Sequence, residues 1–229
     1  MTEIRTETVP LVDGSELRLT VAEPVGSVRG GIVVLHEARG VTDSVRNLVA
    51  GIADDGWLAV APHLYHRDDA DELDPSDTEQ QVQDQIDRLD GEQVMADTDT
   101  AFGWLAEHDI SSDRMGVVGF DLGGSVALLV ATRRTLGAAV TVGGGGISSP
   151  LSVGLPSLIA AAPGLTCPWL GIYDEADPEV ERLREAVAAS EIATDVVTYP
   201  HSGYRFDADP DAAADAWQRT LNWFGSHLR

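Results

Sequence analysis

Lysine is absent from this sequence, and cysteine occurs once, at Cys167. The 15 basic residues are therefore all arginines, and they stand against 38 acidic residues, which gives a net charge of −23. Proteins bind nucleic acids and anionic membranes through basic side chains, so the sequence predicts neither as a partner. A single cysteine excludes an intramolecular disulfide bond and suits a reducing compartment, so we expect a cytoplasmic location.

Long apolar runs and a targeting segment are also missing. The apolar runs are strand-sized, which argues against a transmembrane helix. The first residues, MTEIRTETVPLVDGSELRLT, have neither the basic nor the apolar part of a signal peptide. The 229 residues, 43% of them hydrophobic, suit one domain spanning residues 1–229. No feature indicates an oligomeric state, and the acidic surface fits salt adaptation, biased codon usage or an acidic partner-binding face.

Segments typical of strands and of helices alternate from residue 28 onward. Apolar runs predict strands, and apolar residues at helical spacing predict helices. The expected strands are Val28–Leu35, Trp57–Ala61, Met115–Gly119, Ala138–Val142, Trp169–Tyr173 and Asp195–Tyr199. The expected helices are Thr42–Asp55, Ala96–His108, Ser125–Arg134, Pro178–Ser190 and Pro210–Leu228. A hairpin turning at Asp13-Gly14 precedes them. The alternation predicts an α/β fold, a mostly parallel sheet with helices on both faces.

The segment VVGFDLGG, residues 117–124, has the outline of a nucleophile elbow. In such an elbow, a sharp turn from a strand into a helix exposes one side chain at the top of the sheet. That side chain is normally Ser or Cys, whereas this sequence has Asp121. A carboxylate needs no deprotonation to act as a nucleophile at neutral pH. Asp121 is therefore a candidate nucleophile or base.

Two further residues complete a familiar order along the chain. In sheets of this type, ligands gather at the carboxyl ends of the strands. Asp121, Asp177 and His201 follow predicted strands in the order nucleophile, acid, histidine, which is the order of α/β-hydrolase triads. The sequence therefore predicts that His201 acts as base and that Asp177 orients it.

Five segments resemble the dienelactone hydrolase family of the α/β-hydrolase superfamily. VVLHEARG resembles the first core strand with its His-Glu pair, APHLYHR the Pro-Asp-Leu-Tyr segment, and GFDLGG the Gly-x-Cys-x-Gly-Gly elbow. GIYDEADPEV resembles the acid loop, and YPHSGYRF the Tyr-Pro-x-x-x-His-x-Phe ending. The resemblance covers most of the chain and implies a single α/β-hydrolase domain without a cap domain. It also implies an oxyanion hole made by the backbone N–H groups of Ala38 and Leu122.

Two of the three catalytic positions depart from the family pattern. Asp121 stands where the family has Cys or Ser, and Tyr204 stands where it has histidine; the nearest histidine is His201. Asp177 matches the family acid, and Glu37 matches the glutamate that lies near the nucleophile. The cysteine-based mechanism therefore does not carry over. These five residues are the predicted catalytic set.

Other residues at strand ends are candidate contacts to a small-molecule substrate or ligand. They are His36, Arg39, His63 and Tyr65, with His63 in place of the family's Asp. His36, His63, His66 and His201, with Glu37 and Asp121, also include the ligand types that zinc prefers. They show no tight ligand motif, so neither a metal nor another cofactor is predicted.

Asp121 leaves two functions open, and with them the question of whether the protein is an enzyme. GFDLGG also looks like the Gly-x-Asp-Trp-Gly-Gly elbow of epoxide hydrolases and haloalkane dehalogenases, where Asp attacks carbon and a His-activated water hydrolyses the resulting ester. The first function is a hydrolase of small ester, lactone or related carbonyl substrates with an altered catalytic set. The second is a catalytically degenerate protein that binds a small carboxylate- or carbonyl-bearing ligand, because crowded carboxylates take up a proton or a cation.

Overall fold

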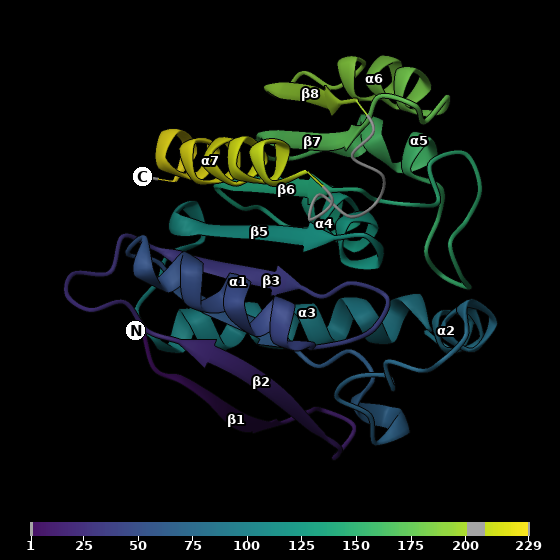
Figure 1. The fold of residues 1–229 in the computed structure, drawn as a ribbon. Helices are drawn as coiled ribbons and strands as arrows, with labels where there is room; N and C mark the ends of the chain where they lie inside the picture. Colours follow the sequence, from purple (N-terminus) through teal and green to yellow (C-terminus); the bar gives the residue numbers. More distant parts are fainter. Residues whose placement is uncertain (1, 201–208, 229) are drawn as a thin grey trace.

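A computed structural model describes residues 2–200 and 209–228 (Figure 1). His201 and Tyr204 lie outside the described residues. Within the described part, eight strands form one sheet in the order β1-β2-β4-β3-β5-β6-β7-β8. The first two strands form an antiparallel hairpin, β2 pairs antiparallel with β4, and the pairs from β4 to β8 are parallel.

The helices and strands have the following bounds. The strands are β1 (Ile4–Pro10), β2 (Glu16–Ala22), β3 (Gly31–Leu35), β4 (Leu58–Pro62), β5 (Met115–Phe120), β6 (Ala138–Val142), β7 (Trp169–Asp174) and β8 (Thr194–Tyr199). The α-helices are α1 (Asp43–Asp54), α2 (Glu79–Ile86), α3 (Gly91–Glu107), α4 (Leu122–Arg133), α5 (Leu158–Ala161), α6 (Val180–Ala188) and α7 (Pro210–His227). Short 3-10 turns cover His66–Asp68, Ser112–Arg114 and Ala162–Gly164.

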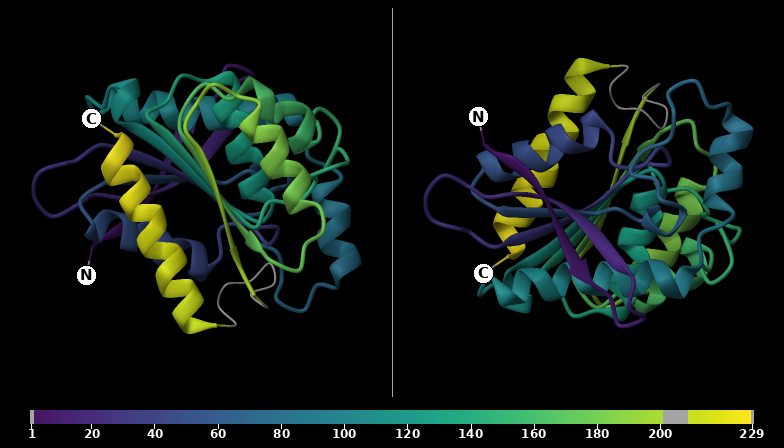
Figure 2. Two further views of the ribbon diagram at one scale, coloured as in Figure 1. Left: turned by 90° about the horizontal axis from the view of Figure 1, so that it is seen from above. Right: turned by 90° about the horizontal axis from the view of Figure 1, so that it is seen from below.

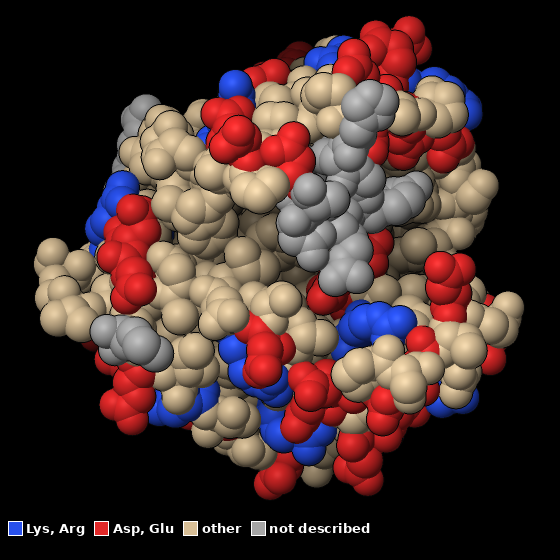
Figure 3. All heavy atoms as spheres, viewed as in Figure 1, with Lys and Arg blue, Asp and Glu red and all other residues tan. Residues whose placement is uncertain are grey.

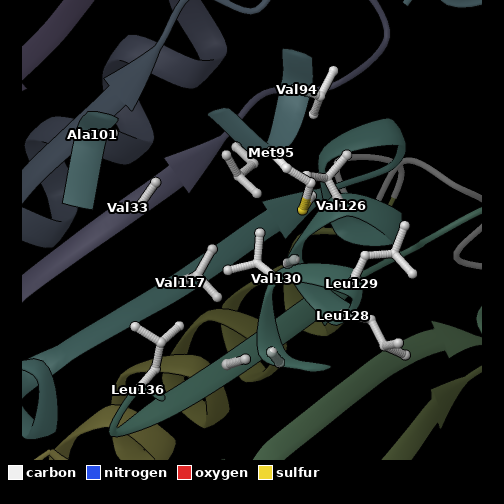
Figure 4. Close-up of a cluster of buried hydrophobic side chains, with 14 of the residues drawn as sticks. Val33, Val94, Met95, Ala101, Val117, Val126, Leu128, Leu129, Val130 and Leu136 are labelled. Atoms are coloured by element: carbon white, nitrogen blue, oxygen red, sulfur yellow. The ribbon is translucent and has the colours of Figure 1, made fainter. Parts of the chain in front are cut away.

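The central strand β3 shows why the sheet is covered on both faces. All five of its residues are buried, and neighbouring side chains point to opposite faces. Ile32 and Val34 belong to a core beneath α1 and α7, whereas Val33 and Leu35 belong to a larger core beneath α3, α4 and α6. Figure 2 shows these helices on opposite sides of the sheet. Figure 4 shows part of the larger core, including Val33 of β3 and Val126 and Val130 of α4.

The predicted fold class is confirmed. The strand over Ala138–Val142 has the predicted bounds, and the C-terminal helix ends one residue early, at His227. Helix α3 begins at Gly91, before the predicted start at Ala96, because the Asp90 side chain caps it by accepting from the N–H groups of Glu92 and Gln93. These differences concern boundaries and leave the topology as expected.

The acidic segment after β4, which has seven acidic residues from Asp68 to Glu79, is attached to the rest of the protein by ion pairs. Asp71 contacts Arg18 at 2.6 Å, and Glu72 contacts Arg46 at 3.2 Å. The segment then leads into α2, which Thr78 opens with a capping box. The repulsion among its carboxylates is therefore offset by arginines from other parts of the chain.

Candidate active site

Asp121 occupies a strained turn between β5 and α4. Its φ of 52° and ψ of −114° lie in a region that non-glycine residues rarely adopt. Glycines on both sides make the turn possible: a Cβ at Gly119 would collide with the Gly123 carbonyl, and one at Gly123 would collide with the Leu35 carbonyl. The Asp121 N–H donates to the Val142 carbonyl at 2.9 Å, which ties the turn to β6. The predicted elbow geometry is therefore present.

The two backbone amides predicted to form an oxyanion hole both contact Asp121 itself. The Ala38 N–H donates to Asp121 Oδ2 at 3.3 Å, and the Leu122 N–H also bonds the carboxylate. Burial raises the pKa of Asp121 above its ordinary 3.8, while the two amide donors act in the opposite direction. The hole thus holds one oxygen of the elbow residue's own carboxyl group.

Three buried side-chain hydrogen bonds position the loop that carries Ala38. His36 Nδ1 donates to the Glu37 carbonyl at 2.7 Å, and His36 Nε2 accepts from the Leu64 N–H at 3.1 Å. The Tyr65 hydroxyl donates to the Ala38 carbonyl at 2.7 Å. His36 and Tyr65 are almost fully buried, so the structure places them beneath the site as supports for the Ala38 amide. Direct contact with a substrate stays a prediction for both.

His63 and Arg39 are also engaged by the protein. His63 is buried between Thr20 Oγ1 at 2.8 Å and Asp71 Oδ1 at 2.6 Å. The Arg39 guanidinium donates to the backbone carbonyls of Asp74 and Asp77, both at 3.1 Å. Their predicted contact with a substrate is untested, and the observed bonds fix the acidic segment to the strand ends.

Asp177 lies after β7, in the loop where the triad acid was predicted. Its Oδ1 accepts from the Glu179 N–H at 2.9 Å, so the loop shapes the carboxylate's position. The histidine that it would orient was predicted at His201, outside the described residues. The same holds for Tyr204, and the roles of all three remain predictions.

A cavity of 520 Å³ opens at Asp121, between α1 and α7. Figure 3 views the face of the molecule that carries these two helices, and the surface is hollowed there. Glu37 and Asp121 contribute to its lining, and Thr42 Oγ1 donates to Glu37 Oε1 at 3.3 Å. The other described lining residues are Ser44, Val45, Asn47, Leu48, Gly51, Phe120, Val142, Ala213, Ala216, Trp217 and Thr220. Of the predicted site residues that the structure describes, Glu37 and Asp121 reach this cavity.

The contribution of α1 and α7 to the cavity was missed from the sequence. Trp217 of α7 packs against the core and also lines the cavity. Gly51 in α1 is the residue in the sequence that reflects this contact. A Cβ at that position would lie 3.2 Å from Trp217 Cζ2, so the glycine permits a close approach of the two helices. Helical spacing alone does not reveal such a pairing.

The described residues form neither a metal-binding cluster nor a membrane-spanning helix. Among residues 2–200 and 209–228, no group of three or more His, Cys, Asp or Glu side chains is arranged to hold a metal ion. No helix in the same residues has the length and apolar character needed to cross a bilayer.

The fold and the elbow define an α/β-hydrolase. The family model for the dienelactone hydrolase family matches residues 17–228, and the chain belongs to that family. It is 29% identical over 208 residues to a Yersinia pestis protein named "Putative carboxymethylenebutenolidase", with 86% of this chain and 78% of the relative covered.

Solved structures show the same architecture. The crystal structure of a "Putative Dienelactone Hydrolase" from Klebsiella pneumoniae is 28% identical, with a TM-score of 0.85 over 98% of this chain and 99% of that one. A dienelactone hydrolase from Anabaena variabilis has a TM-score of 0.74 at 21% identity, covering 100% of this chain and 99% of that one. The second likeness concerns the fold alone.

The buried His36 predicts a measurable pH dependence of stability. Burial lowers the pKa of His36 from 6.5 to about 4, so the folded state binds a proton less tightly than the unfolded state. The resulting stabilisation is complete above pH 6.5 and is lost as the pH falls towards about 4. The loss from this group is about 3 kcal/mol.

The variant His36→Gln isolates that contribution, because an amide can serve the same two partners without titrating. Urea unfolding of both proteins at about pH 7 and about pH 4 should show a smaller loss of stability in the variant. An equal loss in both proteins would mean that His36 is not the titrating group.

Proposed function

We propose that this protein is a hydrolase in which the Asp121 carboxylate attacks an electrophilic saturated carbon, as found in an epoxide or an alkyl halide. The observation that supports the proposal most is the hydrogen bond from the Ala38 N–H to Asp121 Oδ2 at 3.3 Å. The same side chain lines the 520 Å³ cavity. Oδ2 thus accepts from the Ala38 amide, and in this proposal Oδ1 is the attacking oxygen.

In the first step, the second oxygen of Asp121 forms a bond to the substrate carbon. The bond from that carbon to the leaving group breaks, and its electron pair departs with the leaving group. The product of this step is an ester between Asp121 and the alkyl part of the substrate. Ionised Asp121 needs no base here. Its burial removes solvating water and makes the charged form more reactive.

In the second step, water adds to the carboxyl carbon of that ester. The negative charge develops on Oδ2, where the Ala38 amide already lies, and such a preorganised donor stabilises an oxyanion. The bond from the carboxyl carbon to the alkoxy oxygen then breaks, and the alkoxide takes a proton to leave as an alcohol. The base that accepts the water's proton is the role predicted for His201, with Asp177 as its orienting partner.

Acyl transfer from an ester or lactone fits this geometry less well. A substrate carbonyl oxygen would need the two amides, and Asp121 uses them. Attack of a carboxylate on an ester would also give an anhydride, which is a more reactive acyl compound than the ester itself. A site that binds without turnover is the alternative, and the following experiment separates the two.

A single turnover in heavy-oxygen water tests the proposal, with enzyme in excess over hexyl bromide or hexene oxide. We expect the first alcohol or diol molecules to carry ordinary oxygen from Asp121, and the peptide containing Asp121 to gain one heavy oxygen. The peptide containing Asp97, a buried carboxylate in α3, is the internal control and should stay unlabelled.

The outcome is decisive in either direction. Heavy oxygen in the first product and an unlabelled Asp121 would mean direct attack by water, which contradicts the proposal. A well-folded protein that gives neither product nor labelled peptide would favour the binding protein.

A further inference from the structure

The walls of the cavity between α1 and α7 are mainly apolar. Val45 and Leu48 contribute from α1, Ala213 and Trp217 from α7, and Phe120 from the end of β5. The volume of 520 Å³ lies within the range of sites that enclose small molecules. The polar Thr220 hydroxyl donates to the Ala216 carbonyl at 2.9 Å, so its proton is used within α7. An extended apolar group would therefore match most of this surface.

The inner end of the cavity carries acceptors of hydrogen bonds. Glu37 and Asp121 both line it, and none of the described lining residues is basic. The amides of Ala38 and Leu122, the donors nearest to Asp121, already bond its carboxylate. Arg39, the basic residue next to Ala38 in sequence, points its guanidinium at the carbonyls of the acidic segment. A negatively charged ligand would meet the buried Asp121 carboxyl group there.

We propose that this cavity selects an apolar molecule whose polar end donates hydrogen bonds and carries no negative charge, such as an alcohol or a protonated amine. The polar end lies at Asp121, and the apolar part lies between Leu48 of α1 and Trp217 of α7. This inference rests on the proposed function for the reacting end, since hydrolysis of an alkyl substrate leaves an alcohol there. It departs from the carboxylate-bearing ligand predicted from the sequence.

The inference is tested by calorimetric titration of the full chain with three probes of equal length: hexanol, hexylammonium and hexanoate. We expect hexanol and hexylammonium to bind, and hexanoate to bind at least tenfold more weakly. Repeating the titrations at low and high salt separates charge effects from apolar contact, because hexanol is uncharged. Comparison of the affinities for hexanol and hexylammonium then shows whether a neutral or a cationic hydrogen-bond donor is preferred.

A pair of adjacent alanines on α7 supplies matched variants. Ala213 lines the cavity, whereas Ala214 is exposed and is not part of its lining. Ala213→Leu should reduce the affinity for hexanol and hexylammonium at least tenfold by filling the space. Ala214→Leu adds the same apolar group outside the cavity and should leave both affinities unchanged.

Three results would overturn the inference: hexanoate binding as tightly as hexanol, binding that Ala213→Leu does not change, or no binding of any probe. These outcomes are separate from the fate of the proposed function. Labelling of Asp121 without binding of any probe would support the proposed mechanism and contradict the proposed ligand selectivity of the cavity. Binding of the expected probes without labelling of Asp121 would support the proposed ligand selectivity and contradict the proposed mechanism.

Discussion

Turnover by the variant Asp121→Asn is expected to fall by at least about a thousandfold, the scale of loss seen when a nucleophile is removed. An amide lacks the negative charge that attacks the substrate carbon, although it fits the same space. Asn also tolerates a positive φ as well as Asp does, so the elbow at φ 52° should keep its shape. The loss would therefore report the chemistry of the side chain and not a collapse of the turn.

The same substitution should stabilise the protein at neutral pH. Burial raises the pKa of Asp121 above 3.8, so the folded state holds this proton more tightly than the unfolded state does. Stability from this group is therefore present below pH 3.8 and is lost as the pH rises through the raised folded-state pKa. Asn does not ionise, and the difference in stability between variant and wild type should grow with pH.

Thermal unfolding across that pH range measures the effect, and Asp74→Asn is the matched control. Asp74 is exposed, and its hydrogen bonds from Ser76 hold its pKa below 3.8, so its removal should lower stability at neutral pH. At neutral pH we expect Asp121→Asn to be more stable than the wild type and Asp74→Asn to be less stable. A variant Asp121→Asn that keeps full turnover, or whose stability relative to the wild type does not rise from acid to neutral pH, would contradict the assignment of Asp121 as a buried nucleophile.

The sequence was sufficient to predict the strands and a mostly parallel sheet because local signals and the topology agree. β3, β5 and β6 are short runs of apolar residues buried on both faces, and such runs read as parallel strands without further information. The start of α4 was harder to predict. Gly123 and Gly124 suggested a turn, yet both lie in the first turn of the helix, where Gly123 allows contact with the end of β3 and Gly124 with Thr141 of β6.

The candidate site was predictable where it depends on a single turn. The elbow at residues 117–124 placed Asp121, and the resemblance placed the amides of Ala38 and Leu122 beside it. The direction of the Asp121 carboxylate was not predictable, because it depends on which donors surround the side chain after folding. The cavity was missed for a related reason: α1 and α7 are far apart in sequence and meet only in the tertiary structure.

The hydrogen-bond partners of the histidines at strand ends could not be predicted from the sequence. His36 and His63 follow β3 and β4 in the positions where ligands are usually bound, and the sequence offers no sign of their partners. In the structure, His36 bonds two backbone groups and His63 bonds Thr20 and Asp71. The same residue type at the same edge of the sheet can therefore serve as support for the loop that carries the reacting group.

Gly123→Ala is the most destabilising small substitution that we predict, because Gly123 packs against the backbone at the end of β3. A Cβ at Gly123 would collide with the Leu35 carbonyl and lie 2.6 Å from the His36 carbonyl, both backbone atoms at the end of β3. Alanine gains up to about 1 kcal/mol of helix propensity over glycine. Forcing extra volume against a rigid backbone costs about 3 kcal/mol, so the net effect should be a clear destabilisation.

The collision also acts on the site, because relief requires α4 to move away from the loop at Ala38. The Gly123 N–H donates to the His36 carbonyl at 3.1 Å, and this bond joins the elbow to that loop. Its loss would separate Asp121 Oδ2 from the Ala38 N–H, so turnover per folded molecule should also fall.

Gly103→Ala is the matched control for this prediction, since Gly103 lies within α3 and an added Cβ would have no neighbour within 4 Å. Urea unfolding should show that Gly103→Ala gains stability while Gly123→Ala loses it. If Gly123→Ala proved as stable and as active as the wild type, the close packing of the elbow against β3 would not be what holds the two amides at Asp121.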